Sequence, residues 1–209
     1  MKKRKTIYHL IVDKSGSMSD CIDSTINGLN EQINGIKQKQ LAFEDEEITM
    51  GLTTFNTYVD HHFFQSNPNT IKMLNHQTYR PNGSTALLDA IGDTVTQICI
   101  QTQNSNLTTS VVVVILTDGH ENSSRFYNLV KIRNMISSLE ESGNWTFSFI
   151  GATLDAVDVA EQMAIKKQNS FSFEKNKMGS SVWDKLDNSM NHYFEKKKNN
   201  RNLNNLFED

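Results

Sequence analysis

The sequence predicts an α/β fold built on a doubly wound, mainly parallel sheet with helices on both faces. Short apolar segments alternate with longer ones in which apolar residues recur every three or four positions. The run Val111–Leu116 is apolar without alternation, as expected for a central strand buried on both faces. A chain of 209 residues, 37% of them hydrophobic, is long enough for one sizeable core and short for two domains.

Six strands are expected where short segments are apolar or alternate with polar residues. They cover residues 7–12, 48–55, 58–64, 111–116, 145–150 and 170–173. Only Asn56 and Thr57 join the second strand to the third, and this link is too short for a parallel crossover. The two strands therefore form an antiparallel hairpin, and the third strand is expected at an edge of the sheet.

Five helices are expected between the strands, because apolar residues there recur at helical spacing. They cover residues 18–36, 87–98, 126–139, 156–164 and 178–193, of which 156–164 has the weakest pattern. The first is the clearest, since its apolar residues step by four or three positions from Met18 to Ile36. Strands that alternate with helices imply right-handed crossovers and a parallel sheet covered on both sides.

The domain organisation expected from composition is one domain over residues 1–195 and a polar tail over 196–209. The tail is rich in Lys and Asn, and we expect it to fray from the last helix into solvent. Cys21 and Cys99 lie far apart without a CxxC pairing, which disfavours a disulfide framework or a zinc site. With neither a signal-peptide pattern nor an apolar run of about 18 residues, we expect a cytoplasmic protein without a membrane span.

The charge balance excludes some classes of partner. The chain has 21 Lys and Arg against 24 Asp and Glu, a formal net charge of −3. Its lysine clusters, at residues 2–5 and 196–198, lack the interleaved aromatic residues typical of nucleic-acid binding. We therefore expect neither nucleic acid nor a membrane surface as the partner.

Oxygen-bearing residues follow the first predicted strand directly. Asp13, Ser15 and Ser17 are spaced by two positions, so an extended chain turns all three to one side. The carboxyl end of a strand in an open α/β sheet is where ligands bind. The alternative is a tight turn in which Ser17 or Ser19 caps the following helix.

Two further segments add oxygen ligands. Thr85 lies in a loop that opens the helix 87–98, where Ser84 or Thr85 could instead be an N-cap. Asp118 and Gly119 follow the strand 111–116, where Asp-Gly alone often marks a turn. If the first and fourth strands are neighbours, two carboxylates and three hydroxyls meet at one end of the sheet. This set suits a hard cation, Mg²⁺ or in its place Mn²⁺ or Ca²⁺, and leaves room for an Asp or Glu of a partner.

The order Asp-x-Ser-x-Ser, a distant Thr and a distant Asp resembles the metal-ion-dependent adhesion site of von Willebrand factor type A domains. The matching residues are Asp13, Ser15, Ser17, Thr85 and Asp118. The resemblance, which covers about residues 5–195, implies a Rossmann-like sheet in the order 3-2-1-4-5-6 with an antiparallel third strand at the edge. It implies metal binding by these five residues, the hydroxyls directly and the carboxylates directly or through water.

The resemblance also implies metal-assisted binding of a protein partner rather than catalysis. Without a signal peptide or a disulfide pair, the chain is more similar to the intracellular, prokaryotic-type (bacterial) members, which are often parts of larger assemblies. His120, Glu121 and Asn122 follow the Asp-Gly pair, and we expect them at the rim of the site, where they would help to select the partner. Their alternative role is that of solvated loop residues.

Two other functions remain open at this point. One is a metal-free structural scaffold, since an intact motif does not guarantee that an ion is bound. The other is a Mg²⁺-dependent phosphatase-type hydrolase, which also places an Asp after its first strand. That chemistry needs a second acid two positions later, where this chain has Ser15, so the hydrolase is the weaker alternative.

Overall fold

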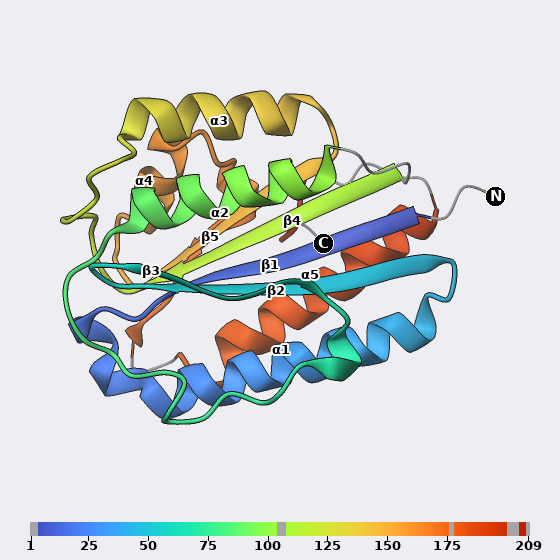
Figure 1. Cartoon of the computed structure of the whole chain (residues 1–209), viewed down its shortest axis with the longest axis horizontal. Helices are drawn as coiled ribbons and strands as arrows, with labels where there is room; N and C mark the ends of the chain where they lie inside the picture. Colours follow the sequence, from blue (N-terminus) through green and yellow to red (C-terminus); the bar gives the residue numbers. More distant parts are fainter. Residues whose placement is uncertain (1–3, 104–107, 176–177, 200–204, 208–209) are drawn as a thin grey trace.

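The computed structural model describes residues 4–103, 108–175, 178–199 and 205–207. It contains a six-stranded sheet in the order β3-β2-β1-β4-β5-β6, with β3 antiparallel to β2 and the other pairs parallel (Figure 1). The strands are β1 (Arg4–Asp13), β2 (Glu46–Phe55), β3 (Val59–Ser66), β4 (Thr108–Thr117), β5 (Trp145–Gly151) and β6 (Ser170–Ser172). The predicted α/β class, strand order and antiparallel edge strand are confirmed.

Helices cover both faces of this sheet, with α2, α3 and α4 on one side and α1 and α5 on the other (Figure 1). The α-helices are α1 (Ile22–Ala42), α2 (Leu87–Thr102), α3 (Leu129–Glu141), α4 (Ala156–Gln162) and α5 (Ser180–Lys198). Short 3-10 turns are η1 (Gly16–Cys21), η2 (Pro68–Thr70) and η3 (Lys167–Asn169). None of these helices, within the described ranges, is both long enough and apolar enough to cross a membrane.

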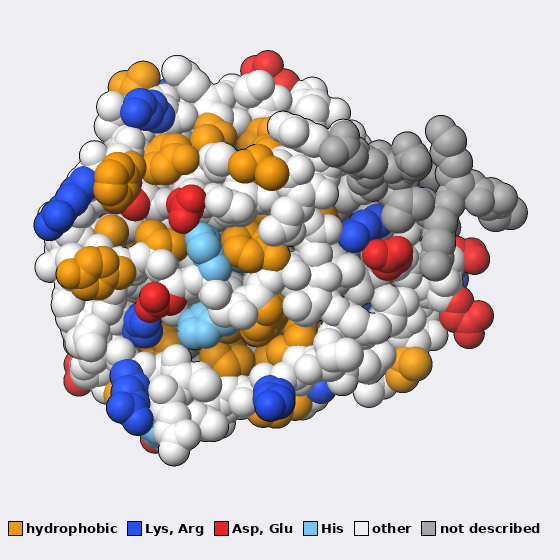
Figure 2. Space-filling model, in the orientation of Figure 1, with side chains coloured by type: hydrophobic (Ala, Val, Ile, Leu, Met, Phe, Trp, Pro, Cys, Tyr) orange, Lys and Arg blue, Asp and Glu red, His pale blue; other side chains and the backbone are white. Residues whose placement is uncertain are grey.

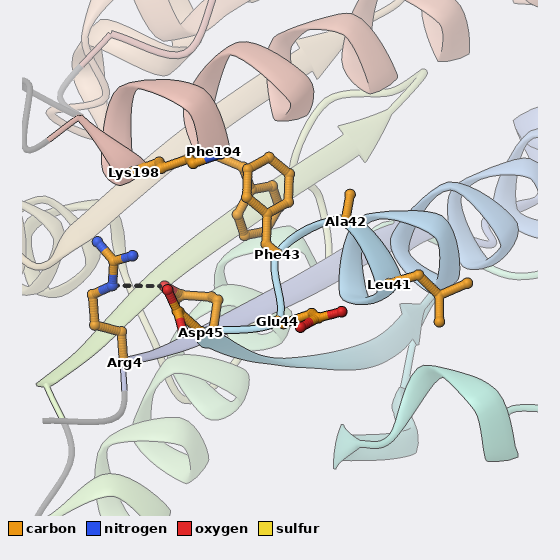
Figure 3. A pocket seen from close by; sticks show the side chains of 9 residues that line it. Arg4, Leu41, Ala42, Phe43, Glu44, Asp45, Phe194 and Lys198 are labelled. Atoms are coloured by element: carbon orange, nitrogen blue, oxygen red, sulfur yellow. Dashed lines mark ion pairs between the residues drawn. The ribbon is translucent and has the colours of Figure 1, made fainter. Parts of the chain in front are cut away.

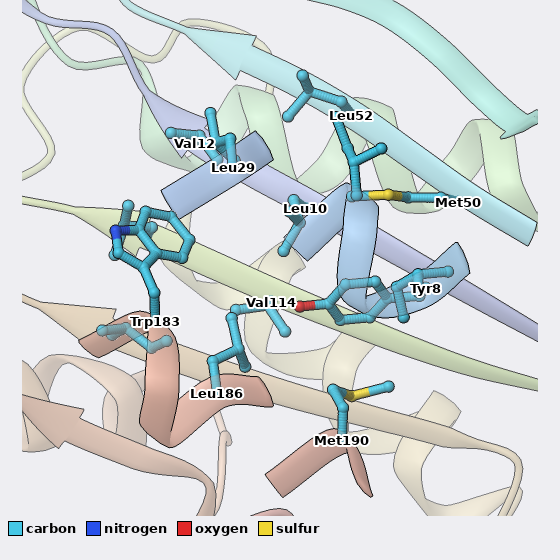
Figure 4. Close-up of a cluster of buried hydrophobic side chains, with 14 of the residues drawn as sticks. Tyr8, Leu10, Val12, Leu29, Met50, Leu52, Val114, Trp183, Leu186 and Met190 are labelled. Carbon is cyan, nitrogen blue, oxygen red and sulfur yellow. The ribbon is translucent and has the colours of Figure 1, made fainter. Parts of the chain in front are cut away.

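Alternate residues of β1 divide between two hydrophobic cores. Tyr8, Leu10 and Val12 pack toward α1 and α5, in a cluster that also contains Trp183 and Leu186 (Figure 4). The intervening apolar residues of β1 pack toward α2, α3 and α4. Helices cover β4 on both faces in the same way. Every residue from Val111 to Leu116 is therefore buried, which explains why this strand is apolar without alternation.

The helix boundaries differ from those predicted by a few residues; α1, for example, covers Ile22–Ala42 where the prediction is 18–36, since residues 16–21 form the 3-10 turn η1. We expected a helix from Phe126, but α3 begins at Leu129, because the side chain of Asn128 caps it by accepting from Lys131 N at 2.9 Å. The amide of Phe126 instead donates to Asp89 Oδ1 at 2.9 Å, and the Phe126 ring is exposed. The spacing of Phe126 fits the apolar pattern of the helix, which is why the prediction includes it. Its amide, however, is bonded to Asp89 and does not belong to the helix.

The last helix continues past residue 195, where we expected the chain to fray. Lys197 is buried, and its ammonium contacts Glu46 Oε1 and Thr6 Oγ1. Farther along, Leu206 is buried and its amide donates to Asn169 Oδ1 at 2.6 Å. These parts of the polar tail therefore pack against the domain.

A pocket of about 250 Å³ lies at the end of the sheet where β1 and β2 begin (Figure 3). It is lined by the last turn of α1 and the loop that follows, together with Arg4, Phe194 and Lys198. The oxygen-bearing residues of the sequence motif lie at the opposite, carboxyl end of the strands.

Candidate metal site

Asp13 is the last residue of β1, and its side chain is held from two sides. The amide of Ser15 donates to Asp13 Oδ1 at 2.7 Å, and Thr117 Oγ1 donates to Asp13 Oδ2 at 2.5 Å. Burial raises the pKa of Asp13, while these hydrogen bonds oppose the rise. Thr117 reaches Asp13 because β1 and β4 pair in parallel, with Val12 opposite Leu116.

Ser15 and Ser17 connect Asp13 to the other carboxylate. Their hydroxyl oxygens lie 3.0 Å apart, and Ser17 Oγ donates to Asp118 Oδ1 at 2.6 Å. Ser15 is buried. The N-cap residues of η1 and α1 make no capping hydrogen bond with their side chains. The turn-and-cap alternative is not what the structure shows, since Ser17 bonds Asp118 and Ser19 Oγ bonds the Gly16 carbonyl at 2.7 Å.

The loop that carries Thr85 is fixed to the loop after β1 by main-chain hydrogen bonds. Gly16 N donates to Gly83 O, and Asn82 N donates to Lys14 O, both at 3.0 Å. Gly83 has φ of +72°, a left-handed conformation that favours glycine. These bonds place the two loops side by side at the carboxyl edge of the sheet.

Thr85 itself is buried, and its hydroxyl makes no hydrogen bond within the described part of the chain. It does not cap α2, whose N-cap residue is Ala86. A Cβ atom built on Gly119 would lie 3.5 Å from Thr85 Oγ1 and 3.7 Å from Ser17 Oγ. The backbone after Asp118 thus lies against both hydroxyls, so the structure brings the five motif residues into one cluster.

Asp118 has a fully buried side chain, and its second oxygen faces a lysine. Lys175 Nζ lies 2.7 Å from Asp118 Oδ2, an ion-pair distance, although no hydrogen bond of good geometry reaches this oxygen. The same ammonium contacts the carbonyl of Ser17 and lies 3.7 Å from Asp20 Oδ2. The ion pair with Asp118 raises the pKa of Lys175 against the lowering effect of burial.

The three residues after Gly119 lie beside the motif cluster. The side chains of two of them, Glu121 and Asn122, accept hydrogen bonds from backbone amides. Glu121 accepts from the amides of Ser123, Ser124 and Leu88, at 2.9, 2.7 and 2.9 Å. Asn122 Oδ1 accepts from Thr85 N at 2.9 Å. Because Leu88 lies in the first turn of α2, Glu121 places a carboxylate at a helix N-terminus. The side chain of His120 is exposed, and its Nδ1 lies 4.0 Å from Asp155 Oδ2.

The donor set matches a hard cation. It consists of two carboxylates and three hydroxyls, which are the oxygen ligands that Mg²⁺ and Ca²⁺ take in proteins. Among the residues described, no group of three His, Cys, Asp or Glu could hold a metal, and this cluster contains only two carboxylates. The buried, poorly bonded Oδ2 of Asp118 is the observation that favours an additional cation.

The two adjacent histidines of the edge strand contact different side chains. Figure 2 shows histidine side chains on this face of the molecule. His61 Nδ1 lies 2.9 Å from Thr53 Oγ1, and His62 Nε2 lies 2.8 Å from Thr54 Oγ1. Since neighbouring residues of a strand point to opposite faces, each imidazole bonds a different threonine of β2.

Two residues that contact the cluster, Thr117 and Lys175, lie outside the sequence motif. Thr117 could have been found, because it precedes Asp118 and is placed beside Asp13 by the pairing of β1 with β4. Lys175 carries no motif and lies 57 positions after Asp118. Only the path of the chain between β6 and α5 brings it to the carboxyl edge.

The fold and the loops at its carboxyl edge define the class: a doubly wound α/β domain with an oxygen-rich cluster between the ends of β1 and β4. The von Willebrand factor type A domain model matches residues 9–192, so the chain belongs to this family. Domains of the family are adhesion-type modules that typically bind other proteins and are usually non-catalytic. A search of the curated proteins found no match.

Solved structures share the fold at low sequence identity. Manganese-loaded TRAP protein of Plasmodium vivax is 18% identical, with a TM-score of 0.60 over 85% of this chain and 71% of that chain. The vWF domain of the type V pili tip protein Mfa5 of Porphyromonas gingivalis is 9% identical, with a TM-score of 0.63 over 92% and 96%. The PilB minor pilin of Streptococcus sanguinis is 14% identical, with a TM-score of 0.60 over 94% of this chain and 62% of the pilin.

Proposed function

We propose that this domain is a divalent-metal-dependent protein-binding module that captures an Asp or Glu of its partner. The ion would be held by the five oxygen-bearing side chains of the motif, Asp13, Ser15, Ser17, Thr85 and Asp118. The observation that carries the proposal is their convergence from three chain segments, with hydroxyls that cap no helix.

Mg²⁺ is the first candidate, with Mn²⁺ and Ca²⁺ as alternatives, because all the donors are oxygen atoms. The solved structure of the TRAP protein, which shares the fold, is loaded with manganese. A bound divalent ion supplies a Lewis-acidic position for a carboxylate oxygen. The chain's own residues orient that position: Thr117 and the Ser15 amide hold Asp13, and Asn122 holds the backbone of Thr85.

The proposed cellular setting is a larger intracellular assembly of prokaryotic type. His120 is the rim residue best placed to touch a partner, since its side chain is 64% exposed. Glu121 and Asn122 would act mainly by holding the loops, because their side chains bond the backbone.

Two alternatives predict different outcomes. A metal-free scaffold would have the same fold and bind no ion at the motif. A Mg²⁺-dependent hydrolase would need a general acid near Asp13, and the residue two positions later is the buried hydroxyl of Ser15.

Calorimetric titration of the EDTA-stripped protein with Mg²⁺ and Mn²⁺ tests the proposal. We expect saturable binding of about one ion per chain, weakened at least about 100-fold by Asp13→Asn or Asp118→Asn, because a charged ligand is lost. Asp93→Asn is the matched control, since this exposed carboxylate pairs with His61 away from the motif. Equal binding by wild type and both site variants would contradict the proposal, and so would the absence of binding both in wild type and in variants that lack the nearby ammonium of Lys175.

A further inference from the structure

We infer that Lys175 is a resident cation of the metal site, which a divalent ion must displace from Asp118. The inference rests on the proposed metal site and specifies what controls its affinity. Lys175 comes from the segment between β6 and α5, far in sequence from every motif residue. Its ammonium lies 2.7 Å from Asp118 Oδ2 and also contacts the main-chain carbonyl of Ser17.

The contacts of Lys175 are those a cation would make. A carboxylate oxygen and a carbonyl oxygen are good ligands for Mg²⁺ or Ca²⁺, and an ammonium binds the same oxygen atoms as a hydrogen-bond donor. The side chain of Asp118 is 0% exposed, whereas that of Lys175 is 31% exposed. Lys175 therefore closes the solvent side of Asp118 while keeping its own route to water.

The backbone on both sides of Lys175 is fixed to the domain. Phe173 N donates to the carbonyl of Gly151, the last residue of β5, at 2.9 Å. Met178 is buried, and its sulfur lies 3.6 Å from Thr25 Oγ1 of α1. Lys175 is thus held over the site by anchors on two different elements rather than being a free surface side chain.

Charge explains why one lysine is an incomplete substitute for the ion. Asp13 and Asp118 together carry two formal negative charges, and one ammonium balances only one of them. A divalent ion balances both, but it must overcome the attraction between Lys175 and Asp118 and any remaining repulsion from the ammonium. Metal affinity is then set by the ion's attraction to the two carboxylates minus these two costs. A displaced Lys175 can keep its ion pair with Asp20, whose exposed Oδ2 lies 3.7 Å from the ammonium.

Lys175→Met removes the charge and keeps most of the length of the side chain. In the metal-free protein, we expect lower thermal stability, because Asp118 is left buried and unpaired. In the metal titration, we expect tighter Mg²⁺ and Mn²⁺ binding by about tenfold or more, because the competing cation is gone. A variant that is less stable without metal and binds metal more tightly is the expected signature of a resident cation.

Lys5→Met is the matched control, because Lys5 pairs with Glu47 at 3.2 Å near the beginning of β1 and β2, at the end of the sheet opposite the motif. It should change neither metal affinity nor the metal-free melting temperature appreciably. Lys175→Gln serves as a second neutral variant if the Met variant folds poorly. In wild type, the backbone NMR signals of Phe173 and Met178 should shift during the Mg²⁺ titration as the lysine leaves.

The outcomes separate this inference from the proposed function. If wild type and both neutral variants bind Mg²⁺ with equal affinity, Lys175 does not compete with the ion and the inference is overturned while the metal site stands. If only the neutral variants bind, the competition is stronger than expected and the inference is supported. If neither wild type nor variants bind at millimolar Mg²⁺, the proposed metal site fails and the inference falls with it.

Discussion

The two ends of the sheet both bury carboxylates, but they neutralise them differently. At the amino end, Glu46 Oε1 accepts a hydrogen bond from Thr6 Oγ1 at 2.7 Å and contacts the buried ammonium of Lys197. Its other oxygen, Oε2, lies 3.5 Å from Arg4 Nε. At the carboxyl end, two carboxylates share hydroxyl and amide donors and a single partly exposed cation, Lys175. A complete internal network indicates a structural role, and an incomplete one indicates room for a ligand.

This difference also shows why the pocket at the amino end of the sheet is a poor guide to the functional end. The pocket beside Glu46 (Figure 3) lies at the amino end, where Glu46 itself is already paired with Lys197 and Arg4. Ligands of open α/β sheets bind at the carboxyl ends of the strands. In this chain, that edge holds the oxygen cluster of the motif, including the buried Oδ2 of Asp118, which no hydrogen bond of good geometry reaches.

Glu46→Gln should have the largest effect on stability. It removes the charge that balances Lys197, whose pKa is lowered by burial despite this pairing. Breaking a buried ion pair by removing one partner typically destabilises a protein, and we expect a loss of about 3 kcal/mol in urea unfolding. Metal affinity should stay as in wild type.

Glu47→Gln is the control for this variant, because Glu47 is partly exposed and pairs with Lys5 at the surface. Its stability should change by less than about 0.5 kcal/mol. Equal stability losses in the two variants, or weaker metal binding by Glu46→Gln, would contradict the separation of the two ends.

His9 tests the middle of β1, between the two ends, through pH. Burial lowers the pKa of His9 to about 3, while an unfolded chain has the ordinary value of 6.5. Between these values the unfolded state binds the extra proton, so stability falls as pH falls below 6.5. The slope is about 1.4 kcal/mol per pH unit, or about 2 kcal/mol between pH 6.5 and 5.

His9→Leu should remove this share of the pH dependence, whatever it does to stability at pH 7. The measurement is urea unfolding at pH 7 and pH 5, above the range in which most carboxylates titrate. His76→Leu is the control, because His76 is exposed and its pairing with Asp23 contributes little. The prediction is wrong if wild type and His9→Leu lose equal stability between the two pH values.

Sequence patterns predict much of the sheet because its determinants are local. The apolar run of β4 and the two-residue link between β2 and β3 specify a central strand and an edge hairpin, and the structure contains both. The motif residues are also placed by strand ends and loop starts, which the pattern marks. Their convergence depends on β1 and β4 being neighbours, and the family resemblance, not the spacing, implied this.

The remaining features depend on contacts between distant segments, which leave no local pattern. Lys175 reaches Asp118 through the path of the chain after β6, and Lys197 reaches Glu46 across the domain. A run of three lysines near a chain end reads as a solvated tail, although one of the three is buried. In the same way, the role of Glu121 follows from its contact with α2, not from its position after Asp-Gly.

Glu121→Gln should have the smallest of these effects on stability. It tests whether Glu121 holds the loop after Asp118 in place, whereas His120 is exposed to a partner. The change removes the negative charge from the N-terminus of α2 and replaces one acceptor with a donor that faces other donors. We expect a loss of about 1 kcal/mol in urea unfolding, comparable to the loss of a helix cap. His120→Ala, at an exposed side chain, should cost less than about 0.5 kcal/mol. If Glu121→Gln keeps full stability yet His120→Ala unfolds more easily, the assignment of bracing to Glu121 is wrong, and the loop is held by contacts of His120 instead.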